Sequence, residues 1–130
     1  MAFYLDTSAA AKLVMAEPDS PAMARWAAVH ESQVIASDLL RTELLRATRR
    51  TAPDRVQRAR SVLDALTLLS LTSATFERAA TLDPQQLRTL DALHIAVALE
   101  LTDELDGIVT YDERMAAAAS SYGIGVIMPT

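Results

Sequence analysis

Four carboxylates stand in apolar surroundings, where ionised side chains are unexpected. They are Asp6, Glu43, Asp91 and Asp112. Asp6 ends the apolar run FYL, and Asp112 follows the run GIVTY. A carboxylate buried among such residues is costly unless it is paired, hydrogen-bonded or bound to a cation. Because ligands bind beyond the carboxyl ends of parallel strands, we expect Asp6 and Asp112 to meet at one edge of a sheet if their strands are neighbours.

The other two acids are predicted on helices, beside apolar faces. Asp91 lies in LRTLDALHIAVALEL (87–101), which is apolar nearly throughout and predicts a buried helix. Glu43 has leucines and an alanine three and four residues away. Each acid also has a structural explanation, since the three aspartates stand where helices would begin and Asp is a preferred N-cap. Glu43 could equally pair on the surface with Arg46 or Arg50.

All the metal-binding atoms that these four acids offer are oxygens, which favours a hard cation such as Mg²⁺ or Mn²⁺. A divalent cation held by carboxylates, with positions left for water and substrate, suits phosphodiester hydrolysis. The hydroxyls of Thr7, Ser8 and Thr110 could support the carboxylates by hydrogen bonds, although the first two could instead cap a helix. We place His94 in the core rather than in the site, because water activated by a cation needs no protein base.

Short apolar runs alternate with helical patterns, which predicts an α/β three-layer sandwich with a central, mostly parallel sheet of four to five strands. The predicted strands are 3–6, 34–37, 67–71, 107–111 and 125–129. The predicted helices are 7–16, 20–31, 38–50, 53–65, 73–82, 88–103 and 112–122. Ser20 with Pro21 predicts one helix start and Pro53 another. With no repeat or linker, residues 1–130 are expected to form one domain.

Composition narrows the class of protein further. The chain of 130 residues has 51% apolar residues and no cysteine, which is typical of a cytoplasmic protein with a sizeable core. We expect neither a signal peptide nor a membrane span. Net charge is −5, yet residues 41–60 contain seven arginines against Glu43 and Asp54. This basic segment suits phosphate or an acidic protein segment, or it is a solvated helical face.

The segments around the four acids resemble those of PIN-domain ribonucleases, specifically the VapC-type toxins of bacterial toxin–antitoxin pairs. They read YLDTSAAAKL around Asp6, LLRTELLRA around Glu43, RTLDALHIAVAL around Asp91 and VTYDERM around Asp112. The resemblance covers almost the whole chain, and the four segments occur in the order and at the spacing typical of the family. By this resemblance the four acids match the catalytic, metal-binding quartet of the family, and Thr110 matches a threonine that commonly precedes the last aspartate by two positions.

The resemblance implies a metal-dependent endoribonuclease that cleaves single-stranded regions of RNA with Mg²⁺ or Mn²⁺. It also implies inhibition by a small VapB-like antitoxin, and a homodimer whose groove brings two active sites near each other. The predicted helix 20–31 and the arginine-rich segment 38–65 are candidates for contact with a second copy, the antitoxin or RNA. The sequence does not choose among these partners.

Proteins of other classes also collect acids at the ends of strands. A receiver-like signalling domain would carry a lysine on a later strand, whereas Lys12 is the only lysine of this chain. A phosphotransferase that uses Asp-x-Asp would need an acid where Ser8 stands. A PIN-like module that binds RNA or protein without cutting it stays open as an alternative.

Overall fold

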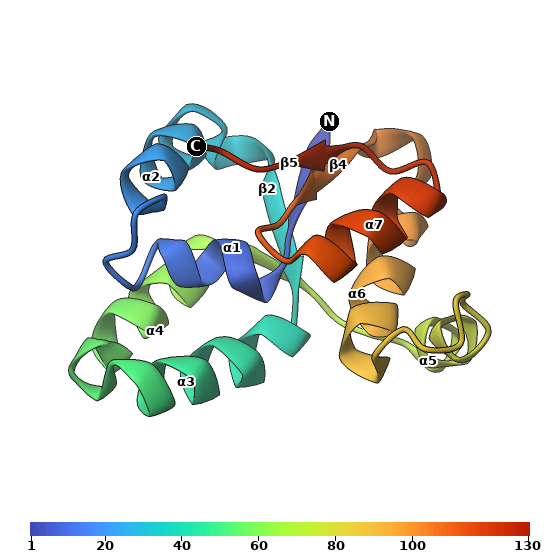
Figure 1. Cartoon of the computed structure of the whole chain (residues 1–130), viewed down its shortest axis with the longest axis horizontal. Helices are drawn as coiled ribbons and strands as arrows, with labels where there is room; N and C mark the ends of the chain where they lie inside the picture. The colour runs from blue at the N-terminus through green and yellow to red at the C-terminus, as the bar shows by residue number, and fades with distance from the viewer.

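Five parallel strands form the centre of the protein, whose computed structural model describes residues 1–130 (Figure 1). The strands are β1 (Ala2–Leu5), β2 (Val34–Ser37), β3 (Thr67–Leu69), β4 (Leu105–Val109) and β5 (Val126–Ile127). Their spatial order is β3-β2-β1-β4-β5, and all neighbouring pairs run parallel. The carboxyl ends of the strands therefore share one edge, and β1 and β4 are adjacent there.

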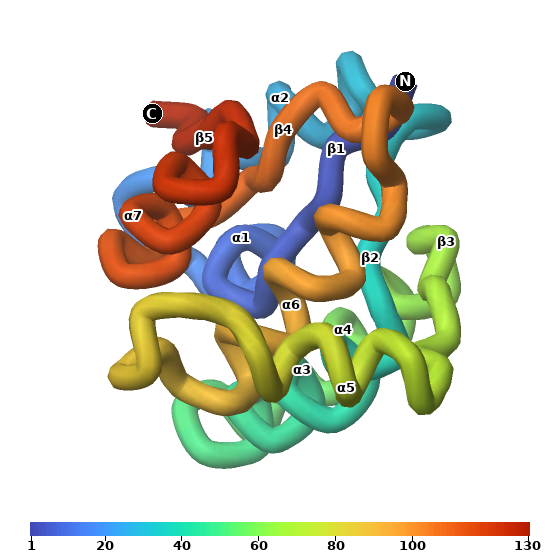
Figure 2. Tube along the Cα trace, turned by 90° about the vertical axis from the view of Figure 1, so that its right-hand side faces the viewer, coloured from blue at the N-terminus to red at the C-terminus, as the bar shows by residue number.

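Helices cover both faces of this sheet (Figures 1 and 2). They are α1 (Thr7–Lys12), α2 (Ser20–Val29), α3 (Leu39–Thr51), α4 (Val56–Ala65), α5 (Ser73–Ala80), α6 (Thr89–Glu100) and α7 (Glu113–Ser121). Helices α1 to α4 contribute to the hydrophobic cluster on one face, α6 and α7 to the cluster on the other, and α5 packs against α6. The predicted three-layer α/β sandwich is confirmed. None of the helices has both the length and the apolar composition that crossing a bilayer requires.

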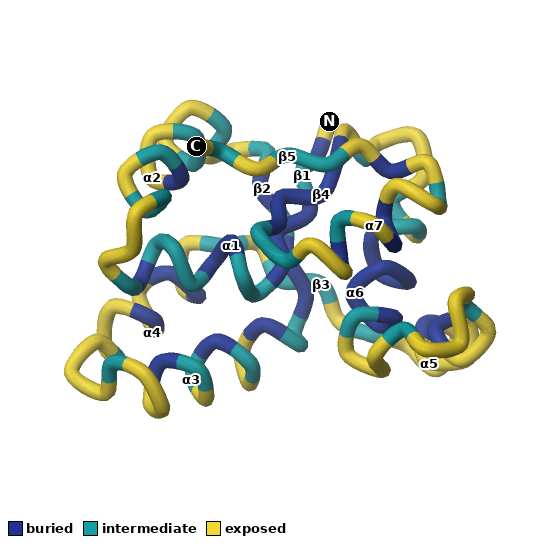
Figure 3. Tube along the Cα trace, in the orientation of Figure 1, coloured by how far each residue is buried: buried dark blue, intermediate teal, exposed yellow.

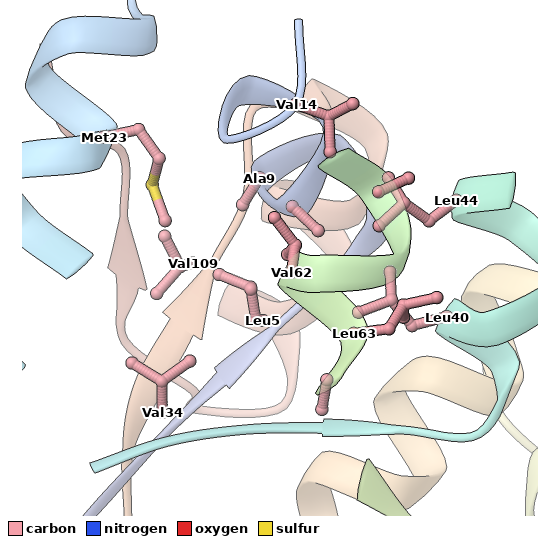
Figure 4. Packing of buried hydrophobic residues seen from close by; sticks show 13 residues of the cluster. Leu5, Ala9, Val14, Met23, Val34, Leu40, Leu44, Val62, Leu63 and Val109 are labelled. Carbon is pink, nitrogen blue, oxygen red and sulfur yellow. The ribbon is translucent and has the colours of Figure 1, made fainter. Parts of the chain in front are cut away.

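The two clusters divide the side chains of β1 between them, because successive residues of a strand point to opposite faces. Leu5 belongs to the cluster of thirteen buried residues that includes Leu44 and Val62 (Figure 4). Tyr4 belongs to the opposite cluster, with Ile95 of α6. Figure 3 shows the burial concentrated at the central strands β1, β2 and β4 and along α6, whose residues 92–98 are all buried. Coverage on both faces explains why the strands are apolar without alternation.

Boundaries differ from the sequence predictions where a local hydrogen bond or a proline decides them. Asp19, not Ser20, precedes the first turn of α2, because the Ser20 hydroxyl donates to the Met15 carbonyl at 2.6 Å and accepts from the Glu17 N–H at 3.0 Å. Pro53 opens a separate 3₁₀ turn, so α4 starts three positions later than predicted, at Val56.

Candidate active site

The adjacency of β1 and β4 places two of the predicted acids at one edge of the sheet. Asp6 directly follows β1, and its N–H donates to the carbonyl of Val109, the last residue of β4, at 3.2 Å. Asp112 follows β4 by three residues and caps α7. The strands that precede Asp6 and Asp112 are therefore neighbours, as the prediction for these two acids required.

All four predicted acids line a single cavity of about 410 Å³. Asp6 and Asp112 contribute from the N-termini of α1 and α7, Asp91 from the first turn of α6, and Glu43 from α3. Figure 1 shows these helices converging on the same end of the sheet. The remaining lining residues include Thr7, Ser8, Arg88 and His94. The fold thus gathers carboxylates from four distant segments.

Asp6 is buried and held by three donors, leaving it 3% exposed. Oδ1 accepts from the Ser8 hydroxyl at 2.7 Å and from the Ala9 N–H at 3.0 Å, and Oδ2 accepts from the Thr110 hydroxyl at 2.6 Å. Burial raises the pKa of Asp6, while these hydrogen bonds act in the opposite direction. Asp6 therefore both caps α1 and presents a fixed, desolvated carboxyl to the cavity.

Glu43 is fixed through one of its two oxygens. Oε1 accepts a hydrogen bond from the Thr7 hydroxyl at 2.9 Å and from His94 Nε2 at 2.6 Å. Oε2 accepts no hydrogen bond from the protein. The surface ion pair with Arg46 or Arg50, the structural alternative for this residue, is not formed, and Glu43 contacts His94 and Thr7 instead. Thr7, Ser8 and Thr110 thus all donate to site carboxylates, and their role around a cation stays a prediction.

His94 connects the site to the core. Its ring is 2% exposed, and Nδ1 lies 2.7 Å from the hydroxyl of Tyr4, which donates to Ser37 at 3.0 Å. Burial raises the pKa of Tyr4, so this hydroxyl keeps its proton for hydrogen bonding. His94 is buried as predicted, but its exclusion from the site was wrong, because it lines the cavity of the four acids and contacts Glu43. Its contact with Glu43, 51 residues away, was missed, and its position three residues after Asp91 was the only signal.

Asp91 and Asp112 are less constrained than the other two acids. Both are half-buried, and Asp91 accepts no hydrogen bond from the protein. Desolvation raises the pKa of Asp91, and the neighbouring Asp112 carboxylate raises it further, against a smaller effect of His94 and Arg88. Oδ1 of Asp112 accepts from the N–H groups at positions 114 and 115, at 2.9 and 3.3 Å. Its second oxygen is not used by α7.

The electrostatics of the cavity favour a bound cation. Its lining has four carboxylates against the guanidinium of Arg88 and the imidazole of His94, and two of those carboxyls have raised pKa values. The donors are carboxylate oxygens, which fit a hard divalent cation. No three His, Asp or Glu side chains form a preassembled ligand cluster. The residues fit such a cation in chemistry and charge, with the ligands still to be drawn together.

Comparison with known proteins identifies the family. The model of the PIN domain matches residues 3–120. In the solved structures, VapC20 of Mycobacterium tuberculosis, a Sarcin-Ricin loop cleaving toxin, has the same fold, with a TM-score of 0.74 over 90% of this chain and 95% of that chain. Its sequence identity is 17%, so this likeness concerns the fold alone. The chain belongs to the PIN domain family.

Relatives of known class narrow the assignment. Ribonuclease VapC47 of Mycobacterium tuberculosis is 37% identical over 130 residues, covering 97% of this chain and 96% of the relative. Ribonuclease VapC46 of the same species is 39% identical over 129 residues, covering 99% of this chain and 98% of the relative. The resemblance to VapC-type PIN-domain ribonucleases, inferred from the segments around the four acids, is confirmed.

Proposed function

We propose that this protein is a metal-dependent endoribonuclease that uses Mg²⁺ or Mn²⁺ to hydrolyse phosphodiester bonds of RNA, as the toxin of a toxin–antitoxin pair. The observation that carries the proposal is the single cavity lined by all four acids at the carboxyl ends of β1 and β4. The names of the VapC relatives, each a ribonuclease, support the reaction class. The oxygen donors favour Mg²⁺ and Mn²⁺ alike as the cation.

The four acids are assigned to holding the cation, which, when bound, polarises a phosphate and lowers the pKa of water. Asp6, with three hydrogen bonds, provides a ligand whose position is set in advance. Glu43 offers Oε2, since Oε1 is engaged by Thr7 and His94. Asp91 and Asp112 keep oxygens that can turn toward the cation without breaking a bond to another side chain.

The partners proposed for this chain follow from its membership of the VapC group. They are an RNA substrate, a VapB-like antitoxin and a second copy of the chain in a homodimer. The cytoplasm is the proposed location, in keeping with a chain that has no cysteine. The antitoxin, the homodimer and the location are independent of the cavity and can fail without affecting the nuclease proposal.

The direct test is cleavage of single-stranded RNA by the purified protein. We expect cleavage with Mg²⁺ or Mn²⁺, and loss of cleavage with a chelator. Asp91→Asn removes one charge at a side chain that makes no hydrogen bond in the protein, so its fold is preserved while cleavage falls by about 100-fold or more. Circular dichroism and thermal unfolding of the variant provide the control for folding.

Two results would overturn the proposal in different ways. Equal cutting by the wild type, the Asp91→Asn variant and the chelated protein would show that the activity comes from another site or a contaminant. No cutting of any RNA by a folded protein that binds RNA would favour the alternative of a silent PIN-like binding module.

A further inference from the structure

The seven arginines of the basic segment fall into two groups once their contacts are known. Arg41 pairs with Asp38 at 2.8 Å. Arg55 and Arg58 donate to the carbonyls of Val14 and Leu13 at 3.0 and 3.1 Å, just beyond the C-terminal end of α1. These three arginines stabilise the fold through polar contacts, since each satisfies an acceptor of the protein itself.

The other four arginines have no such contact. Arg46, Arg49, Arg50 and Arg60 form no ion pair and no side-chain hydrogen bond in the structure, and all are exposed. Because unpaired guanidinium groups are well suited to bind phosphate, these four are the side chains of the segment that are available to a partner.

Two of the four lie in a groove beside the active site. Arg46 and Arg50 line a groove of about 820 Å³ between α3 and the α5–α6 pair, helices that Figures 1 and 2 show at the same end of the molecule. Its lining shares Thr7, Glu43 and Leu90 with the cavity of the four acids. On α3, positions 43, 46 and 50 follow the spacing of one helical face. The groove is therefore continuous with the cavity. Along α3, Glu43 lies where the two meet, and Arg46 and Arg50 lie further into the groove.

We propose that this groove is the path by which a single strand of RNA reaches the cavity, with Arg46 and Arg50 contacting its phosphates. The inference rests on the proposed nuclease function and adds the position of the substrate. The chain as a whole is acidic, with a net charge of −5, so an RNA strand has to approach a local basic surface. Next to a cavity lined by four carboxylates, these two guanidinium groups provide the compensating charge.

The opposite wall of the groove suits bases. Phe76 of α5 is 52% exposed and Leu90 of α6 is 46% exposed, which is unusual for large apolar side chains in this protein. Exposed aromatic rings beside a basic track are typical of surfaces that bind single-stranded nucleic acid, because every base can stack on them. Phosphate on the α3 wall and a base on the α5–α6 wall give one strand two chemically different contacts.

The test compares two double variants that remove the same charge. Arg46→Ala with Arg50→Ala changes the groove, whereas Arg49→Ala with Arg60→Ala removes two free arginines that do not line it and lie in a neighbouring hollow between α3 and α4. Both are made in an Asp91→Asn background, so that RNA stays intact. Binding of a labelled single-stranded RNA, about 12 nucleotides long, is followed by fluorescence anisotropy with Mg²⁺ across a range of salt concentrations.

We expect the groove variant to lower the slope of log affinity against log salt by about 1.4, since each phosphate contact on a single strand contributes about 0.7. The control variant is expected to keep both slope and affinity close to those of the parent. Equal losses in the two variants would show a general charge effect and overturn the assigned path. An unchanged slope in the groove variant would overturn it as well.

A second measurement separates RNA from a protein occupant. If the groove variant, or Phe76→Ala, alters the oligomeric state in sedimentation without weakening RNA binding, the groove is an interface between copies and the inference is wrong. Cleavage by the protein with an intact Asp91 is measured in parallel. Normal cleavage with an unchanged slope rejects the path alone, whereas absent cleavage in every sample rejects the nuclease function.

Discussion

The four acids of the cavity form two pairs that are held in contrasting ways: Asp6 and Glu43, the fixed wall, and Asp91 and Asp112, the free wall. Asp6 and Glu43 are held by five hydrogen bonds, of which four come from side chains and one from the Ala9 N–H. On the other wall, Asp91 accepts none, and Asp112 accepts only from the backbone of its own helix. One wall is fixed by the fold, and the other keeps oxygens that can move.

The contrast distinguishes the effect of holding a carboxylate in place from the effect of its charge. On the fixed wall, the supporting donors compensate the burial of a carboxylate, so their loss should reduce both stability and activity. On the free wall, Asp91 accepts no hydrogen bond and its ionisation is disfavoured, so neutralising it should reduce activity while leaving stability unchanged or higher. The following predictions test this separation, in order of decreasing effect.

Removing a donor from the fixed wall should have the largest effect on stability. Thr110→Val keeps the shape of a fully buried side chain but deletes the hydroxyl that donates to Asp6 and accepts from the Asp112 N–H. We expect a loss of about 1–3 kcal/mol in the free energy of unfolding, measured by urea denaturation. Thr51→Val, at an exposed position of α3, is the control and should stay within about 0.5 kcal/mol. Similar stability of both variants would contradict the fixed wall.

Loosening Glu43 should mainly affect catalysis. His94→Ala removes the donor to Oε1 and should reduce RNA cleavage by about 10–100-fold, with a higher Mn²⁺ concentration needed for half-maximal rate. His94→Gln retains an N–H donor at a similar distance along the side chain, so part of the activity should return. Equal rates for the alanine and glutamine variants, after correction for the folded fraction, would remove His94 from any positioning role.

Cation binding should draw the two walls together and stabilise the fold. At a concentration of ten times the dissociation constant, Mg²⁺ or Mn²⁺ should add about 1.4 kcal/mol, which corresponds to a rise in melting temperature of roughly 4 °C. Differential scanning fluorimetry measures the shift, with Ca²⁺ and Na⁺ as controls. Asp91→Asn should lose most of it, and a full shift in this variant would place the cation elsewhere.

The smallest effect is the pH dependence of the free wall without metal. Because the pKa of Asp91 is raised in the folded protein, the folded state binds the proton more tightly, and this carboxyl lowers stability increasingly as the pH rises through its folded pKa. With a chelator present, Asp91→Asn should therefore be more stable than the wild type at pH 7. The difference should shrink as the pH falls toward 3.8, the ordinary pKa of the group. A constant difference in urea midpoints would contradict this.

Much of the scaffold could be predicted from local patterns. Each strand is a short apolar run, so the sequence alone was enough to place Asp6 directly after one strand and Asp112 shortly after another, although the starts of α2 and α4 differ from those predicted. The order of strands added the adjacency of β1 and β4, which brings these two acids together. That adjacency arises from packing between segments about a hundred residues apart, and alternation of elements alone does not determine it.

Contacts between side chains were harder to predict. The bond from His94 to Glu43 depends on how α6 and α3 face each other across the site, which the spacing within each helix does not report. The arginines show the same limit. Arg55 and Arg46 are indistinguishable by composition, yet one satisfies a carbonyl of the fold while the other lines a groove.

The aspartates that begin α1 and α7 have a practical consequence for anyone preparing a harmless form of this protein. Alanine at position 6 or 112 would remove a proposed ligand and also the N-cap of a helix, so a variant made that way could fail to bind the proposed antitoxin because it is misfolded. Asparagine starts helices as well as aspartate does. It is the safer replacement when the inactive protein is needed for co-crystallisation.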